Sequence, residues 1–286
     1  MAKKNDDETV REHYIPQFYL KQFSPNKKII YQYNVFSDKA SSILTSTTEV
    51  CFEKNLYEYR DDKGEIVNKN LIEKRLSVFE AEFASVFQSI HSKAAFKQNH
   101  HTSSFLSTRE KILLVFFIST LLSRDPKVIQ LAKECAIEEL GELMDDTTAR
   151  NLALNICLPV HKALDTEERT LLKQYIQALE NMSFQIGIAE KDVFWTSDHP
   201  AIVKGVSVEG QAFNIEQVSI PLSSRIALLM KPYEKVSPEN YNRLVILGEK
   251  EIRAINAATV TNCYRWIYSK APLTEKQIQW IKKQRK

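Results

Sequence analysis

The sequence predicts an α+β protein in which strands from both ends of the chain form a sheet and a helical layer is inserted between them. Three observations lead to this prediction. Short apolar runs open the chain, a period of 3.6 residues begins at about Val67, and short apolar runs return from Met182. We therefore expect a single domain over residues 1–286, with a helical region inserted at residues 66–183.

The N-terminal third is predicted to contain a short helix followed by strands. Between Arg11 and Phe23, aromatic residues recur at helical spacing, and Pro16 is tolerated in a first helical turn, so a helix should start at about Ile15. After a turn at residues 24–26, alternation of apolar and polar residues predicts extended segments. They lie at residues 29–36 and 43–50, and residues 55–59 then run into a turn at residues 61–64.

The middle of the chain is predicted to be helical. Apolar residues from Leu71 to Ile90 mark one face of a long amphipathic helix. Ser107 to Glu110 form a capping pattern for a very apolar, and therefore central, helix over residues 109–123, which Pro126 stops. Further helices are expected at residues 127–144, 147–157 and 166–182.

The last third returns to strands and closes with helices. Short apolar runs between glycine, proline and polar breaks predict strands. These runs lie at residues 184–189, 193–195, 201–203, 218–220, 226–230, 244–247 and 264–268. Helices are expected at residues 249–262 and from Thr274 onward.

Composition excludes several classes of protein. The 286 residues carry 39 basic and 36 acidic side chains, and a net charge of +3 is too balanced for a general electrostatic nucleic-acid binder. The longest apolar run, residues 112–122, is about half of the ~20 residues that span a bilayer. Four scattered cysteines without a CxxC pair indicate reduced, buried thiols. The N-terminus lacks an apolar secretory run, so we expect a cytoplasmic protein without membrane contact.

Known catalytic motifs are missing from the sequence. It contains no GxSxG, no Walker-type loop and no HExxH, and its 6 glycines make a glycine-rich phosphate loop unlikely on composition alone. A site therefore has to be assembled from single polar residues that lie far apart in the chain. Ser197, Asp198 and His199 are consecutive, but neighbouring residues on an extended chain point in different directions and do not form a triad among themselves.

The segment HYIPQFYLKQF, residues 13–23, resembles the HYxPxxYLxxF signature of a functionally uncharacterised family of microbial and fungal proteins. Later segments resemble further motifs of that family in the same order, and the resemblance extends over most of the chain. They include residues 55–57, 72–73, 79–80, 124–126, 196–200, 220–223 and 255–256. In the family, asparagine is more common where His199 stands. The resemblance implies which polar residues matter and implies no reaction.

Six polar residues are candidates for a functional site: His13, Glu80, Arg124, Ser197, Asp198 and Asn256. His13 lies at the start of the aromatic helix, where an imidazole either serves chemistry or merely caps and packs. Arg124 ends the most apolar helix, where it either binds an anion or interacts with the helix C-terminus.

Ser197 and Asp198 follow a predicted strand, a place that rigidly positions site residues, although a local turn explains them equally well. Asn256, on a C-terminal helix, would orient a partner.

Two hypotheses for function remain open. In the first, the protein is a hydrolase, with a metal-dependent nuclease or phosphodiesterase as the leading case. His13, Glu80 and Asp198 then hold Mg²⁺ or Mn²⁺ or act as acid and base, and Arg124 binds a nucleic acid or another phosphate-containing substrate. This hypothesis requires the four side chains to meet in one cleft. In the second, the protein is a non-catalytic binding module that contacts a protein or nucleic-acid partner through its aromatic N-terminal segment and basic tail at residues 282–286. The sequence leaves the oligomeric state open.

Overall fold

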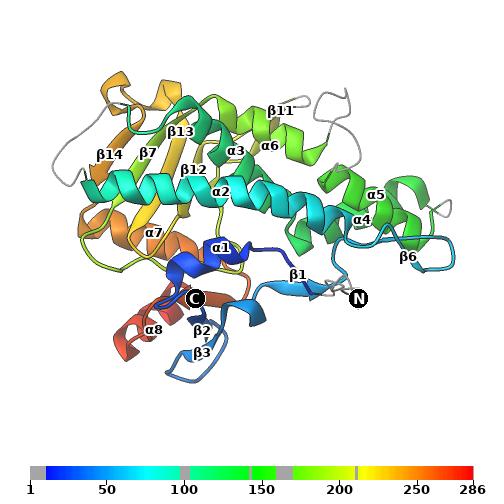
Figure 1. Cartoon of the computed structure of the whole chain (residues 1–286), viewed down its shortest axis with the longest axis horizontal. Helices are drawn as coiled ribbons and strands as arrows, with labels where there is room; N and C mark the ends of the chain where they lie inside the picture. Colours follow the sequence, from blue (N-terminus) through cyan, green and yellow to red (C-terminus); the bar gives the residue numbers. More distant parts are fainter. Residues whose placement is uncertain (1–10, 97–103, 142–143, 159–169, 210–211, 286) are drawn as a thin grey trace, which may run out of the picture.

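The computed structural model describes residues 11–96, 104–141, 144–158, 170–209 and 212–285, and it confirms the α+β class. Two larger sheets occupy the left-hand and lower parts of the molecule in Figure 1, and helices α4 and α5 lie at its right-hand end. The two sheets draw on different parts of the chain, and helices cover and join them.

The larger sheet has five strands in the order β14-β7-β13-β12-β9. Its strands are β7 (Met182–Ile188), β9 (Ile202–Lys204), β12 (Gln217–Pro221), β13 (Ile226–Pro232) and β14 (Arg243–Ile246). Neighbours are antiparallel except β14 and β7, which are parallel. β7 and β13 are buried along most of their length, as expected for central strands with helices packed over them.

The second sheet has four strands in the order β3-β2-β15-β8. They are β2 (Ile29–Asn34), β3 (Ile43–Ser46), β8 (Thr196–Ser197) and β15 (Trp266–Ser269). Because β15 pairs with β2, strands from the two ends of the chain share a sheet, as predicted from the sequence. Two strand predictions were wrong in detail, since residues 193–195 and 264–265 lie outside strands and instead bond to side chains of neighbouring segments.

Short two-stranded ribbons complete the β structure. They are β1 (Arg11–His13) with β4 (Phe52–Lys54), β5 (Tyr59–Arg60) with β6 (Ile66–Val67), and β10 (Ser207–Glu209) with β11 (Ala212–Asn214). The N-terminal helix begins later than Ile15, because Pro16 is its N-cap. Here α1 (Gln17–Leu20) continues directly into a 3-10 turn at Lys21–Phe23.

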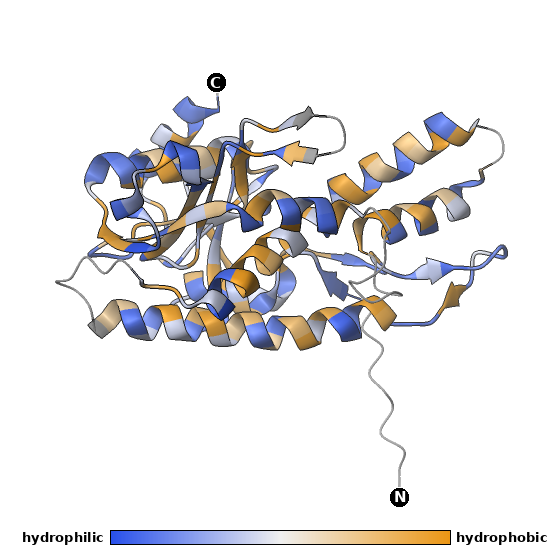
Figure 2. Cartoon of the chain, turned by 90° about the horizontal axis from the view of Figure 1, so that it is seen from above, coloured by the Kyte–Doolittle hydropathy of each residue, from blue (hydrophilic) through white to orange (hydrophobic). Residues whose placement is uncertain are grey.

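Helices follow one another between β6 and β7. They are α2 (Leu71–Phe96), α3 (Thr108–Ser123), α4 (Pro126–Leu140), α5 (Asp146–Cys157) and α6 (Leu171–Glu180). The predicted helix at residues 166–182 begins outside the described residues and ends earlier, because Met182 already belongs to β7. α2 crosses the front of the molecule in Figure 1, and in Figure 2 hydrophobic and hydrophilic residues alternate along it, as an amphipathic helix requires.

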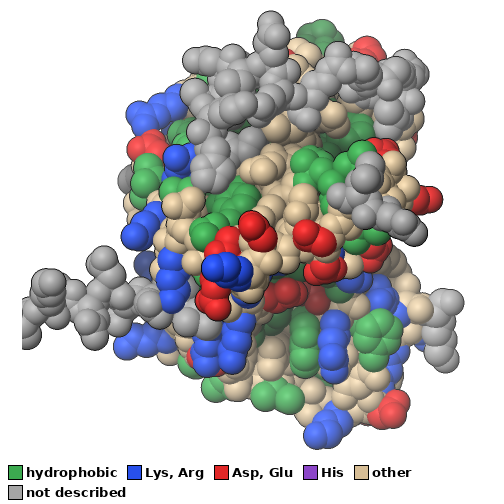
Figure 3. All heavy atoms as spheres, turned by 90° about the vertical axis from the view of Figure 1, so that its right-hand side faces the viewer, with side chains coloured by type: hydrophobic (Ala, Val, Ile, Leu, Met, Phe, Trp, Pro, Cys, Tyr) green, Lys and Arg blue, Asp and Glu red, His purple; other side chains and the backbone are tan. Residues whose placement is uncertain are grey.

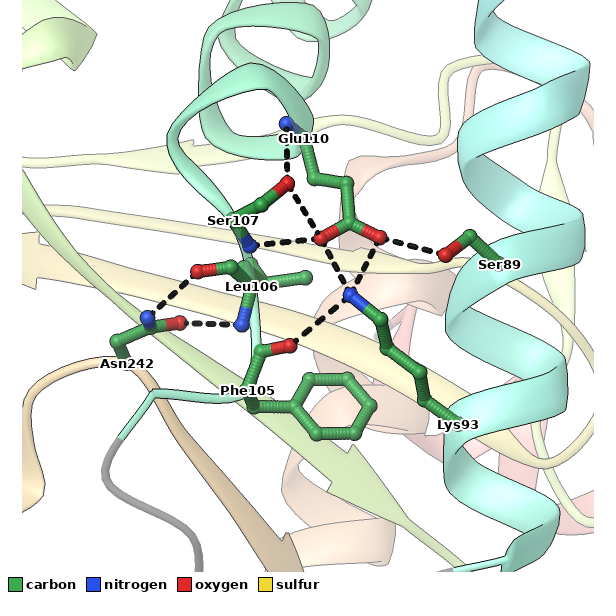
Figure 4. A network of polar contacts seen from close by, with 7 residues as sticks. All are labelled: Ser89, Lys93, Phe105, Leu106, Ser107, Glu110 and Asn242. Carbon is green, nitrogen blue, oxygen red and sulfur yellow. Dashed lines mark hydrogen bonds and ion pairs between the residues drawn. The ribbon is translucent and has the colours of Figure 1, made fainter.

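A polar network fixes the N-terminus of α3 (Figure 4). Ser107 and Glu110 form the predicted capping box, and Lys93 of α2 bonds the Glu110 carboxylate at 2.5 and 2.7 Å. Burial acts to raise the pKa of Glu110, but hydrogen bonds from Lys93, Ser89 and Ser107 outweigh it and lower the pKa to about 2. Asn242 precedes β14 and bonds the backbone of Leu106 twice. Its Oδ1 accepts the Leu106 N–H, and its Nδ2 donates to the Leu106 carbonyl.

The main core lies between the five-stranded sheet and helices α1, α2 and α3. Phe117 is at its centre, with its ring within 6 Å of the rings of Phe18, Tyr19, Phe83 and Phe87. These aromatic contacts hold the signature segment against the helical layer. The sequence-based prediction of a central, very apolar α3 is therefore confirmed by its burial.

Two C-terminal helices join the sheets. α7 (Glu249–Asn262) packs against β9 and β12 of one sheet and β8 of the other, and α8 (Glu275–Gln284) packs against α7. The cysteines Cys51, Cys157 and Cys263 are free and buried, whereas Cys135 is exposed, contrary to the prediction. Within the described residues, no helix has the length and apolar character needed to cross a membrane.

Candidate functional site

Arg124, at the C-terminal end of α3, is the most tightly held of the predicted site residues, with 1% of its surface exposed. Nη1 lies 2.8 Å from Glu80 Oε1 on α2, and Nη2 donates to the backbone carbonyl of His13 in β1. Nε donates to the Tyr57 hydroxyl at 3.2 Å, and the guanidinium lies 5.6 Å from the centre of that ring. Its donors are therefore committed to protein groups, which argues against the predicted role as an anion clamp.

His13 and Glu80 thus meet at Arg124, as the sequence-based hypothesis required. The carbonyl of His13, however, makes the contact. Its imidazole is half-buried, tilted against the ring of Phe52 at 5.7 Å, with Nε2 3.5 Å from Gln17 Nε2. Burial lowers the pKa of His13 and Arg124 lowers it further, while a backbone bond to Thr48 and the charge of Glu80 oppose the shift.

Two further buried glutamates lie in this region: Glu73 interacts with Arg124, and Glu12 interacts with the Tyr57 backbone and with Arg150. Glu12 is 1% exposed, and its Oε2 accepts the backbone N–H of Tyr57 at 2.7 Å. Within the described residues, Glu12 Oε1 and Glu73 Oε2 are buried without a hydrogen-bond partner. Burial raises the pKa of both Glu12 and Glu73 to about 7, and Glu58 adds like-charge repulsion to each. Both carboxyls therefore bind a proton more tightly than an exposed glutamate does.

Sequence reasoning did not select Glu12 or Glu73 as site residues, although a signal existed for each. Glu12 immediately precedes His13 in the signature segment, and Glu73 lies two helical turns before Glu80 on α2. Charged residues in segments that are otherwise apolar have to meet compensating groups when those segments are buried.

Asp198 is held by backbone groups of the segment that leads into β15. Oδ1 accepts the N–H of Tyr264 at 2.9 Å, and Oδ2 accepts those of Arg265 and Trp266 at 2.8 and 3.0 Å. Burial raises the pKa of Asp198, and these three bonds oppose the shift. This carboxylate therefore organises the chain around β15 through long-range bonds, and not through the local turn that the sequence offered as the alternative.

Ser197 and Asn256 also bind backbone groups. The Ser197 hydroxyl is fully buried and accepts the N–H of His199 at 3.2 Å. Asn256 of α7 accepts the N–H of Trp195 at 3.3 Å and donates to the carbonyl of Val193 at 2.9 Å. Both side chains hold the segment between β7 and β9 in place.

The predicted metal ligands His13, Glu80 and Asp198 are not assembled into one site. Across the described residues, no group of three or more His, Cys, Asp or Glu side chains is arranged to hold a metal ion. The physical reason is that Glu80 is paired with Arg124 and Asp198 with three backbone N–H groups. Glu80 and Arg124 thus bond each other, whereas Asp198 bonds the segment before β15.

A different pair, His199 and Asp125, has the geometry of a positioned imidazole. His199 Nδ1 lies 2.7 Å from Asp125 Oδ2, and the carboxylate is buried while 18% of the histidine side chain is exposed. Asp125 is the N-cap of α4, and its Oδ1 accepts the N–H of Lys127 at 2.8 Å. Sequence reasoning treated the two motifs separately and missed this contact between residues 74 positions apart.

Aromatic and basic groups complete the surroundings of this pair. The Tyr264 ring stacks on the His199 imidazole with a centroid distance of 4.7 Å. Lys127 Nζ lies 3.6 Å from the centre of the Tyr264 ring, so an exposed ammonium stands beside the stacked imidazole. Burial raises the pKa of Tyr264, and Asp125 raises it further, so its hydroxyl stays protonated.

The His199–Asp125 pair connects electrostatically with the glutamate cluster. Glu53 of β4 interacts with Asp125 and with Arg150 of α5, and Arg150 in turn interacts with Glu12. Figure 3 shows the end of the molecule where α4, α5 and β1 lie, and acidic side chains gather there in and above a hollow. Polar groups thus extend along the junction of the helical layer and the N-terminal strands.

Comparison with protein-family models matches residues 11–272 to the family described as "Protein of unknown function (DUF4238)". The match covers most of the chain, and the protein therefore belongs to this uncharacterised family. Comparisons with curated proteins and with solved structures find no match.

Replacing Arg124 with alanine should destabilise the protein by roughly 3–5 kcal/mol, because Glu80 and the His13 carbonyl would lose their buried partner. Chemical denaturation measures this change. Arg109→Ala is the matched control, since its ion pair with Glu82 is exposed on both sides and should contribute less than about 1 kcal/mol. Equal losses in the two variants would contradict the role of Arg124 as a central cross-link.

The Glu12→Gln variant should be more stable than the unchanged chain at pH 8, and by a larger margin than at pH 5. The folded state raises the pKa of Glu12 from 4.5 to about 7, so it binds the proton more tightly than the unfolded state, and stability falls as the pH rises between these values. Glutamine carries no charge to desolvate. We expect the stability difference to grow by about 2 kcal/mol from pH 5 to pH 8.

Denaturation of the variant and of the unchanged chain at each pH tests this prediction. His13 and His91 have lowered pKa values, but both proteins contain them, so their effects cancel in the difference between the two stabilities. Glu65→Gln, at an exposed position, is the control and should show no such trend. A pH-independent difference for Glu12→Gln would contradict the raised pKa.

Proposed function

We propose that this protein is a hydrolase in which His199, oriented by Asp125, acts as the general base that activates water. The observation that supports this most directly is the 2.7 Å contact between His199 Nδ1 and the buried Asp125 carboxylate. A base held in this way presents its second ring nitrogen in a fixed direction. The proposal keeps the reaction class inferred from the sequence and changes the residues that carry it.

The contacts of Asp125 define how the imidazole works. Oδ1 accepts the N–H of Lys127 and Oδ2 lies within hydrogen-bond distance of Nδ1, so Nδ1 carries the proton and the lone pair resides on Nε2. Nε2 takes a proton from water as the water oxygen attacks the substrate. The resulting imidazolium, stabilised by Asp125, returns the proton to the leaving group when the bond to it breaks.

One cation beside the pair, Lys127, is placed to contact an ester that carries negative charge. Lys127 is exposed beside Tyr264, in the first turn of α4, where the helix dipole adds positive potential. An anionic substrate, such as a phosphodiester in a nucleic acid, would place its charge near this ammonium. The substrate class inferred from the sequence therefore remains part of the proposal.

The alternative of a non-catalytic binding module draws less support from the basic tail. Arg285 Nη1 donates to the carbonyls of Val260, Thr261 and Cys263 at 3.0–3.3 Å, and Lys282 Nζ donates to the carbonyl of Asp38 at 3.2 Å. Two cations of the tail are thus used to anchor α8 and to satisfy the carbonyls at the end of α7.

His199→Asn should lower kcat/KM on a phosphodiester substrate by at least about 100-fold, because an amide cannot serve as a base. Asparagine is also the residue more common in the resembled family, so the fold should remain intact and the melting temperature should change little. The chemistry would then be specific to proteins with histidine at this position.

The assay uses bis(p-nitrophenyl) phosphate, single-stranded RNA and DNA, and p-nitrophenyl acetate, each with and without Mg²⁺ or Mn²⁺. Asp125→Asn should also reduce kcat, since it disturbs the orientation of the imidazole. His91→Asn makes the same chemical change on α2, away from the pair, and should retain activity. An unchanged protein that is inert on every substrate, or a fully active His199→Asn variant, would contradict the proposal.

A further inference from the structure

A cavity of about 360 Å³ lies between the segment before β8, helix α7 and the start of helix α8. Neither Asp125 nor His199 lines it, so it is separate from the proposed catalytic pair. Its size is at the lower end of the range for small-molecule sites, which is roughly 300–1,000 Å³. A cavity of this volume accommodates one or two fused rings with a short substituent.

Two tryptophans form its aromatic wall. Trp195 and Trp280 meet edge to face with centroids 5.8 Å apart, and Trp195 is 7% exposed. Asn256 bonds the backbone on either side of Phe194, which fixes the Trp195 wall to α7. The cavity is therefore built before any ligand arrives, and little ordering is needed on binding.

The charge of the lining is positive. Asp192 is the only acidic residue among the lining residues, and it is bonded to Lys270 at 3.0 Å and to the Ser224 hydroxyl at 2.5 Å. Arg253 and Lys276 also line the cavity, and within the described part of the chain neither has an ion pair or a side-chain hydrogen bond. Two cations are therefore available to an incoming anion.

We propose that this cavity binds a small planar aromatic anion, with its ring against Trp280 and Trp195 and its anionic group at Arg253 and Lys276. The aromatic walls favour a flat ring through stacking and edge contacts. Arg253 and Lys276, which have no partner among the described residues, favour an anionic group on that ring. Arg and Lys bind phosphate or carboxylate groups, and two of them at one cavity add their attraction for the same anion. A nucleoside monophosphate and an aromatic carboxylate both have this chemistry.

Isothermal titration calorimetry on the full-length chain distinguishes a nucleoside monophosphate from an aromatic carboxylate as the ligand. AMP and indole-3-acetate are the probes. Saturable binding of either probe is the expected result and identifies the anionic group. Adenosine lacks the charge and inorganic phosphate lacks the ring, and each should bind at least about tenfold more weakly than the corresponding anion. No saturable binding of either probe, or equal binding of AMP and adenosine, would overturn the proposal.

Charge reversal locates the site. Arg253→Glu and Lys276→Glu change exposed side chains, so they should leave the melting temperature nearly unchanged and weaken binding at least tenfold. Lys283→Glu makes the same change on α8 outside the cavity lining and should bind like the unchanged chain. Equal binding by all three variants would place the ligand elsewhere and overturn the assignment. Phosphodiester hydrolysis is assayed in parallel, because neither His199 nor Asp125 lines the cavity and the two proposals can therefore fail separately.

Discussion

The buried guanidinium of Arg124 is the interaction on which the arrangement of the helical layer and the N-terminal segment depends. A charge that is 1% exposed has to be compensated by groups brought to it, and these come from α2, β1 and the segment that contains Tyr57. The signature segment is thus held to α2 and α3 by a polar contact at His13 and by the aromatic core around Phe117. Glu80 carries the carboxylate that bonds the guanidinium directly, and Glu73 adds a second acidic group near it.

The adjacent residues Arg124 and Asp125 serve different purposes because α3 ends and α4 begins between them. Arg124 faces the glutamates, and Asp125 caps α4 and holds His199. The cross-link at Arg124 therefore directly precedes the carboxylate that contacts the imidazole of His199. A site supported in this way resists the displacement that a flexible loop would allow.

Sequence patterns predicted the class of fold and most helices, because α2, α3 and α7 each carry a local periodicity or capping signal. They also identified segments whose polar residues are buried. They did not predict which groups meet, because the contact between Asp125 and His199 depends on the placement of β8 beside β15, and pairing across the chain leaves no local signal. Asp198 was interpreted as a site residue because its three backbone partners, at residues 264–266, are likewise too far away in the sequence to leave a local signal.

The pairing of β2 with β15 also governs the order in which the chain can fold as it is synthesised. The β2–β3 hairpin emerges early, yet one edge of β2 stays without its partner until Trp266–Ser269 have been made. At typical elongation rates this interval is on the order of 10–50 s, during which an exposed strand edge can pair with other chains.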